Sequence, residues 1–135
     1  MSMLLELKNV RLRTGDQLKI KGFVLKDADR FRINLGSDEE NLALHFNPRF
    51  SDTTDESVLV FNSRKAGSWG EERKESPNPL HRGRDAKIVL KLAGDVFKVE
   101  LPDGHKFIFP NRENVDVISY IGIGGDFKLT SFKIC

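Results

Sequence analysis

The chain is poor in cysteine and has no long apolar run. Cys135, the last of its 135 residues, is the only cysteine, which excludes an internal disulfide framework and a cysteine-built zinc site. No stretch approaches the roughly 20 apolar residues that a membrane-spanning helix needs. The start, residues 1–6, is too short and too soon charged for a signal peptide. We therefore expect a cytoplasmic protein that, if it acts outside the cell, is secreted by a signal-peptide-independent route.

A large excess of either charge is also missing. Lysine and arginine total 22 against 20 aspartates and glutamates, a formal net charge of +2. Nucleic acids and anionic membranes require concentrated positive charge, so this surplus argues against either as the main partner, and no membrane insertion is expected. Hydrophobic residues make up 39% of the chain and include ten phenylalanines. This content excludes a disordered protein and suffices for the core of a single domain over residues 1–135.

The chain is rich in two-residue alternation of apolar and polar side chains, which predicts strands buried on one face. Turns that contain glycine or aspartate separate these segments, as at residues 14–16, 93–95 and 102–104. No apolar stripe of helical period occurs. About ten strands without helices predict an all-β sandwich or barrel. Residues 64–68 and 75–84 are predicted to be irregular, on either side of one short strand.

One predicted strand carries an unusual polar row. His45, Asn47 and Arg49 share one face at about 7 Å per step, while Leu44 and Phe46 point into the core. Imidazole, amide and guanidinium groups are planar and form directional hydrogen bonds. The row suits a ligand with many hydroxyl groups, although an ordinary solvated sheet face explains these three residues equally well.

The following strand and loop extend this polar face. By the same parity, Val60 and Asn62 face the side of the row. Trp69, the only tryptophan, has charged rather than apolar neighbours, so we expect an exposed indole. An exposed indole can stack on the C–H-rich face of a sugar ring. Glu72 and Lys74 share one parity and are placed to flank such a ring.

These motifs resemble the galectins, the β-galactoside-binding lectins. The resemblance rests on HFNPRF at 45–50, VFNS at 60–63 and WGEE at 69–72. Asn62 follows Arg49 by thirteen positions, Trp69 follows Asn62 by seven, and Glu72 follows Trp69 by three. Segments 109–112 and 125–131 are also similar, so the resemblance covers nearly the whole chain. It implies a jelly-roll β-sandwich of two antiparallel sheets that forms a single carbohydrate-recognition domain of the prototype type.

The resemblance also implies how galactose is held. His45, Asn47 and Arg49 would bind the axial 4-hydroxyl, which distinguishes galactose from glucose because an equatorial hydroxyl would leave these groups unpaired. Asn62 and Glu72 would bind the 6-hydroxyl. The implied ligands are lactose and N-acetyllactosamine.

One position departs from the family pattern near the second sugar. By the resemblance, Trp69 stacks on galactose, while Arg49 and Glu72 reach the 3-hydroxyl of the following glucose or N-acetylglucosamine and pair with each other. The family usually has arginine two residues after this glutamate, where this chain has Lys74. Lysine lacks the planar fork, so we expect galactose recognition to survive and discrimination at the second sugar to weaken. A one-residue bulge that brings Arg73 into the site is the alternative.

Two further arginines are predicted on the same face. Parity places Arg30, Arg32 and Asn34 on the strand beside His45, where they would lengthen the groove beyond galactose. They could bind a sulfate, a sialic acid or another sugar on the galactose 3-position. Solvated surface arginines are an equally good interpretation.

Other classes of function fit the sequence less well. A glycosidase needs two opposed carboxylates. Near the polar row, Glu71, Glu72 and Glu75 lie together on one segment and the strand of His45 has no acid to oppose them, so we expect no enzyme activity. His45, His81 and His105 lack the spacing of a metal site, and no cofactor is expected. A lipid-binding barrel would need an apolar cavity and usually a helical lid. A galectin-fold interaction protein with weak or altered glycan specificity stays open.

The resemblance to single-domain galectins implies a non-covalent homodimer. The predicted first strand, residues 6–13, and last strand, residues 127–134, are natural edges for it. Two sites in one dimer would crosslink the β-galactoside glycans of glycoproteins and glycolipids, which raises avidity without new contacts. Cys135 could oxidise outside the cell and crosslink dimers.

Overall fold

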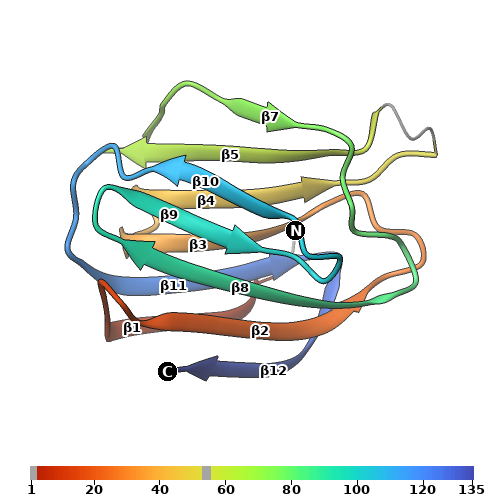
Figure 1. Ribbon diagram of the computed structural model, residues 1–135, viewed down its shortest axis with the longest axis horizontal. Helices are drawn as coiled ribbons and strands as arrows, with labels where there is room; N and C mark the ends of the chain where they lie inside the picture. The colour runs from red at the N-terminus through yellow and green to blue at the C-terminus, as the bar shows by residue number, and fades with distance from the viewer. Residues whose placement is uncertain (1–2, 53–55) are drawn as a thin grey trace.

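The computed structural model describes residues 3–52 and 56–135, which form two antiparallel sheets packed face to face (Figure 1). This part of the chain contains strands and turns but no α-helix, and so no helix that could cross a membrane. The predicted all-β sandwich is confirmed.

The larger sheet has seven strands in the order β1-β11-β3-β4-β5-β6, and β7 also pairs with β5. Its strands are β1 (Met3–Arg13), β3 (Phe31–Asp38), β4 (Asn41–Arg49), β5 (Val58–Lys65), β6 (Ser68–Trp69), β7 (Arg73–Glu75) and β11 (Val117–Gly125).

The smaller sheet has five strands in the order β10-β9-β8-β2-β12. Its strands are β2 (Gln17–Val24), β8 (Asp85–Ala93), β9 (Val96–Glu100), β10 (Lys106–Pro110) and β12 (Phe127–Ile134). The edge strands β1 and β12, one from each sheet, lie on the same side of the sandwich (Figure 1).

The core between the sheets is built from the inward side chains of the alternating strands. Phenylalanine rings dominate it: Phe46 and Phe61 lie 5.2 Å apart between ring centroids, and Phe61 and Phe109 lie 6.0 Å apart. Burial of these large rings removes much apolar surface from water and fixes which face of each strand points inward. The polar face of β4 and β5 is therefore turned outward.

The segment after β5 is more regular than the sequence predicts. β5 continues to Lys65 and turns at Ala66 and Gly67 into β6, so that Trp69 pairs with Arg64. Both turn residues have positive φ, 50° and 81°, as in the two-residue hairpin turns that favour asparagine or glycine. Alanine at the first position hides this turn, which explains why residues 64–68 were wrongly predicted to be irregular. The first strand also begins earlier than predicted, at Met3.

Candidate functional site

A groove of about 440 Å³ lies on the outer face of the larger sheet, over β3 to β6 and the segment that follows β6. It brings together eight residues that the sequence predicted on this face, together with Gly70. The lining residues are Arg30, Arg32, His45, Asn47, Arg49, Asn62, Trp69, Gly70 and Glu72.

His45 presents a hydrogen-bond acceptor to this groove. It lies between Asn34 of β3 and Asn62 of β5 in the sheet register. Its Nδ1 lies 2.6 Å from the Asn34 Oδ1 atom, an arrangement in which the Nδ1–H group donates to the amide oxygen. Nε2 then has no proton and carries the free lone pair.

The surroundings of His45 keep its ring neutral. Burial, together with the positive charges of Arg32, Arg49 and Arg64, lowers the pKa of His45 to about 4. Nε2 is therefore an acceptor at neutral pH and well below it.

Asn47 and Arg49 are oriented by contacts inside the protein. Asn47 Nδ2 donates to the Phe31 carbonyl oxygen at 2.8 Å, and Asn47 Oδ1 accepts from Arg49 Nε at 3.0 Å. Arg49 Nη2 also lies 3.7 Å from a Glu72 carboxylate oxygen. One Asn47 N–H and the end of the Arg49 fork remain available as donors.

Asn62 is held by three hydrogen bonds. Its Oδ1 accepts from the Ser63 backbone N–H at 2.8 Å and from Arg112 Nη1 at 3.2 Å, and its Nδ2 donates to the Gly70 carbonyl oxygen at 3.1 Å. One amide N–H is left for a ligand. The orientation of this amide is set by the protein before any ligand arrives.

Arg112 is a positioning residue that the sequence did not reveal. Besides Asn62, it donates to Ser63 Oγ at 3.0 Å and to the Glu71 carbonyl oxygen at 2.7 Å, and its guanidinium lies 4.6 Å from the Phe109 ring centroid. It thus joins β5 to the segment that carries Gly70. Its hydrogen-bond partners are 41 to 50 residues away in the chain, beyond the reach of local patterns. The only signal was its place in the galectin-like segment 109–112.

Trp69 is exposed, as predicted, with 49% of its surface accessible. Its indole lies against the His45 ring, with 4.6 Å between centroids, and the Arg64 guanidinium lies 5.1 Å from its centroid. These contacts hold the indole at the rim of the groove and leave about half of it open.

Glu72 is shared between two cations. Its carboxylate lies 3.7 Å from Arg49 Nη2 and 3.6 Å from Lys74 Nζ. Arg73 stands opposite Phe61 in the register and pairs instead with Glu75, at 3.0 Å. Since β7 pairs regularly, the alternative in which a bulge brings Arg73 into the site is wrong.

Val60 and Lys74 were also predicted to belong to the site, but neither is among the residues that line the groove. Val60 lies opposite Asn47 and Lys74 in the register, but only 1% of its surface is exposed, so it supports the groove from beneath. Lys74 reaches the groove only through Glu72.

Arg30 and Arg32 both line the groove, Arg32 from β3 and Arg30 from a bridge to Arg49 just before that strand. Within residues 3–52 and 56–135, no carboxylate lies within ion-pair distance of either. This end of the groove is therefore positively charged.

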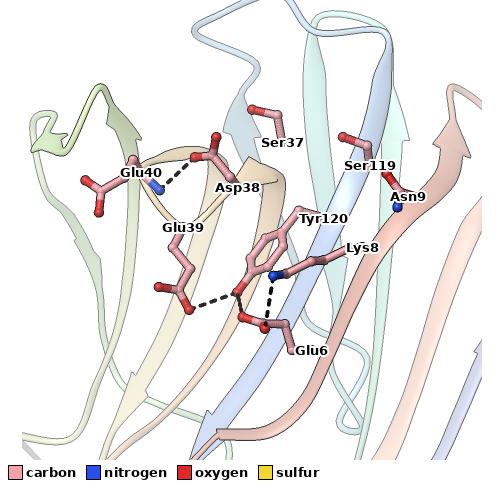
Figure 2. Close-up of a pocket in the computed structure, with 9 residues that line it drawn as sticks. All are labelled: Glu6, Lys8, Asn9, Ser37, Asp38, Glu39, Glu40, Ser119 and Tyr120. Carbon is pink, nitrogen blue, oxygen red and sulfur yellow. Dashed lines mark hydrogen bonds and ion pairs between the residues drawn. The ribbon is translucent and has the colours of Figure 1, made fainter.

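A second hollow, of about 490 Å³, lies on the same sheet over β1, β11 and the β3–β4 turn (Figure 2). Figure 2 shows the Tyr120 hydroxyl between Glu6, to which it donates at 2.8 Å, and Glu39, 3.4 Å away. Burial and these carboxylates raise the pKa of Tyr120, and its hydrogen bond lowers the pKa of Glu6. Asp38 and Glu40 add further negative charge, so this hollow disfavours anions.

The groove provides a neutral acceptor, amide and guanidinium donors, one carboxylate and an open indole. Such a set binds a ring that has hydroxyl groups on its edge and an apolar face. No three histidine, cysteine, aspartate or glutamate side chains gather as metal ligands in the described chain. Fold and groove together define a β-sandwich lectin.

Comparison with known proteins identifies the family. The family model described as "Galactoside-binding lectin" matches residues 3–134, and the chain belongs to this family, the galectins. It is 43% identical to galectin-1 of Bos taurus over 121 residues, 90% of each chain. It is also 43% identical to galectin-2 of Mus musculus over 134 residues, 99% of each chain.

Solved structures agree with this assignment. Chicken galectin 2 superposes with a TM-score of 0.94 and 44% identity, covering 99% of this chain and 100% of that one. CG-16, a homodimeric agglutinin from chicken liver, gives a TM-score of 0.91 and 36% identity over 97% and 98% of the two chains.

The neutral state of His45 leads to a first prediction. NMR titration of the histidine rings should show His45 with a midpoint about pH 4 and as the Nδ1–H tautomer. Because an unperturbed histidine has a pKa of about 6.5, the neutral ring contributes stability above that pH, which is lost as the pH falls toward about 4. Asn34→Ala, which removes the acceptor for Nδ1–H, should give a mixture of tautomers. A wild-type midpoint near 6.5 would contradict this assignment.

A second prediction concerns Arg112. Arg112→Lys removes the fork that orients Asn62, and we expect the affinity for lactose to fall about tenfold. Isothermal titration measures the affinity, and thermal melts show whether the fold is kept. Arg84→Lys, at an exposed arginine outside the groove, is the matched control and should bind normally. Unchanged affinity of a folded Arg112→Lys protein would rule out the positioning role.

Proposed function

We propose that this protein binds β-galactosides, including lactose and N-acetyllactosamine, in the groove of the larger sheet. The main support is the convergence of the His45 Nε2 acceptor with the free donors of Asn47 and Arg49. A single axial hydroxyl at that point can donate to the imidazole and accept from the other two. The 4-hydroxyl of galactose has this axial direction, whereas that of glucose does not.

The rest of galactose fits the remaining groups. The free amide N–H of Asn62 donates to the 6-hydroxyl and Glu72 accepts from it, while Trp69 covers the apolar face of the ring. Because these side chains are already fixed by Arg112, His45 and Arg49, the ligand orders few of them on binding.

The second sugar meets Arg49 and Glu72. Lys74 approaches the same carboxylate as a point charge and offers no second parallel hydrogen bond, in contrast to an arginine fork. We infer that the 3-hydroxyl of glucose or N-acetylglucosamine is bound less firmly here than with arginine at residue 74.

The opposite end of the groove favours an anionic or strongly polar group on the galactose 3-position. Arg30 and Arg32 lack carboxylate partners among the described residues, whereas the hollow around Glu6 and Glu39 carries negative charge. Arg32→Ala should therefore weaken binding of 3-O-sulfated lactose more than binding of lactose. Equal loss for both ligands would count against this subsite.

The protein acts by binding and not by catalysis. Among the residues that line the described groove, Glu72 alone has a carboxylate, whereas glycoside hydrolysis requires a pair. Incubation with lactose should release no galactose; release would overturn this part of the proposal.

A homodimer is proposed to give the protein two sites. β1 and β12 are unpaired edges on one side of the sandwich, and Leu4 and Ile134 are exposed there. A second copy docked along these edges would continue both sheets and crosslink glycans on glycoproteins and glycolipids. Sedimentation velocity of the protein and of Leu4→Asp tests this arrangement. A wild-type protein that stays monomeric at micromolar concentration would exclude it.

We propose that the protein is located in the cytoplasm and also reaches the cell exterior. The single cysteine, Cys135, is free and exposed, which suits a reducing compartment, while galactoside glycans lie outside the cell. Cell fractionation together with assay of the medium tests this proposal. Absence from the medium while the cells stay intact would contradict the export.

Isothermal titration with lactose tests the galactoside function. We expect a dissociation constant of about 0.1 to 1 mM with lactose, and no heat with sucrose. Trp69→Ala should abolish measurable binding because the stacking surface is lost. The control Ile108→Ala removes an exposed apolar side chain from the other sheet and should bind normally. No heat with lactose from a folded protein would favour a galectin-fold interaction protein with altered glycan specificity.

Lys74→Arg tests the second-sugar contact. Restoring the planar fork beside Glu72 should strengthen N-acetyllactosamine binding about threefold to tenfold. Methyl β-galactoside, which has no second sugar, is the control ligand and should bind both proteins equally. An unchanged affinity for N-acetyllactosamine would show that Lys74 does not weaken binding of the second sugar.

A further inference from the structure

The outward face of the smaller sheet is covered with lysine. The register turns every lysine of its five strands outward: two on β2, two on β8, one on β9, one on β10 and two on β12. The acids on this surface, the lysine face, are Asp85 and Glu100, which leaves a surplus of six positive charges. The whole chain has a net charge of +2, so the remainder sums to −4.

The lysines are arranged at a cost to folding. Lys21 stands directly opposite Lys87, Lys19 opposite Lys133, and Lys91 opposite Lys98. Like charges in opposed positions of a sheet destabilise it. Glu100 lies 3.3 Å from Lys91 of β8 and 4.0 Å from Lys106 of β10, which offsets part of the charge there. No described carboxylate lies within ion-pair distance of the Lys21–Lys87 and Lys19–Lys133 pairs. An external polyanion would relieve this repulsion.

The shape and composition of the lysine face select the kind of polyanion. Five strands about 4.8 Å apart spread the charges over roughly 20 Å in two dimensions, not along one line. Arginine, whose fork suits bidentate contacts with phosphate or sulfate, is absent from all five strands, although the chain contains ten. Flexible point charges without forks suit a smooth anionic plane better than a linear sulfated or nucleic-acid chain. Ile108, 52% exposed and opposite Lys98 on the edge strand β10, adds an apolar side chain to this face.

We propose that the lysine face docks on the surface of an anionic phospholipid bilayer without entering it. Its lysines would lie in the negative surface potential of the lipid headgroups, which attracts basic residues within a Debye length. The larger sheet, with its groove, lies on the other side of the sandwich, and its acidic hollow around Glu6 and Glu39 is disfavoured at such a surface (Figures 1 and 2). The molecule is thereby oriented with its groove away from the lipid. Presentation of that groove to glycans rests on the proposed function, whereas the docking does not.

Vesicle co-sedimentation of the full chain tests the docking. Vesicles of phosphatidylcholine with about 30 mol% phosphatidylserine should bind the protein at about 50 mM salt and release it at about 500 mM, and phosphatidylcholine alone should not bind it. The triple variant Lys21→Gln, Lys87→Gln, Lys98→Gln should lower the partition coefficient about 100-fold. The charge-matched control Lys8→Gln, Lys26→Gln, Lys65→Gln, at lysines outside this face, should change it about twofold or less.

Three outcomes would overturn the proposal: no phosphatidylserine-dependent binding at low salt, an equal loss in both triple variants, or release of the protein from vesicles by lactose. Binding to heparin beads but not to vesicles would likewise overturn it and identify a linear polyanion as the partner. Lactose titration of both variants separates the two proposals. Unchanged lactose affinity with lost vesicle binding supports docking by the lysine face, and absent lactose binding with retained docking removes only the galactoside function.

Discussion

The pairing of β4 with β5 is the constraint on which the site depends. Phe46 lies opposite Phe61, and their buried rings pack 5.2 Å apart in the core. A shift of β4 by one residue would turn Phe46 to solvent and the polar row inward, and the core would lose one of its largest buried side chains. The same register sets His45 opposite Asn62. Core packing, not the ligand, therefore fixes the spacing of the groups that face the groove.

Inside that frame, each polar group of the groove is partly satisfied by the protein. No buried side-chain nitrogen or oxygen of the described residues lacks a partner. Asn47 and Asn62 each use one of their two side-chain N–H groups within the protein. The other N–H group of each amide is left for a ligand in the groove. Such an arrangement limits the ligand to groups that match the leftover donors and acceptors, because a mismatched hydroxyl leaves a desolvated polar group unpaired. Selectivity thus follows from what the internal hydrogen bonds leave unused.

Local periodicity accounts for what could be predicted. The row from His45 to Arg49 follows from the two-residue period of one strand, and the exposure of Trp69 follows from its charged neighbours. Arg112 could not be predicted because its contacts bridge distant segments. The burial of Val60 depends on the side chains that cover it, so parity alone could not give it. At Ala66 the local signal was misleading, because tertiary pairing of β5 with β6 imposes a positive φ that alanine seldom adopts.

Strand parity separates more than core from solvent. In a two-sheet sandwich, strand parity also assigns each solvent-exposed residue to one of two opposite faces. The net charge of the chain adds the charges of both faces together. Here six of the ten arginines lie on strands of the larger sheet and none on the smaller, while eight of the twelve lysines lie on the smaller. Arginine is placed where planar forks orient neighbouring side chains, as at Arg49, and lysine where only charge is presented. A net charge of +2 therefore excludes a strongly basic protein but not a strongly basic face.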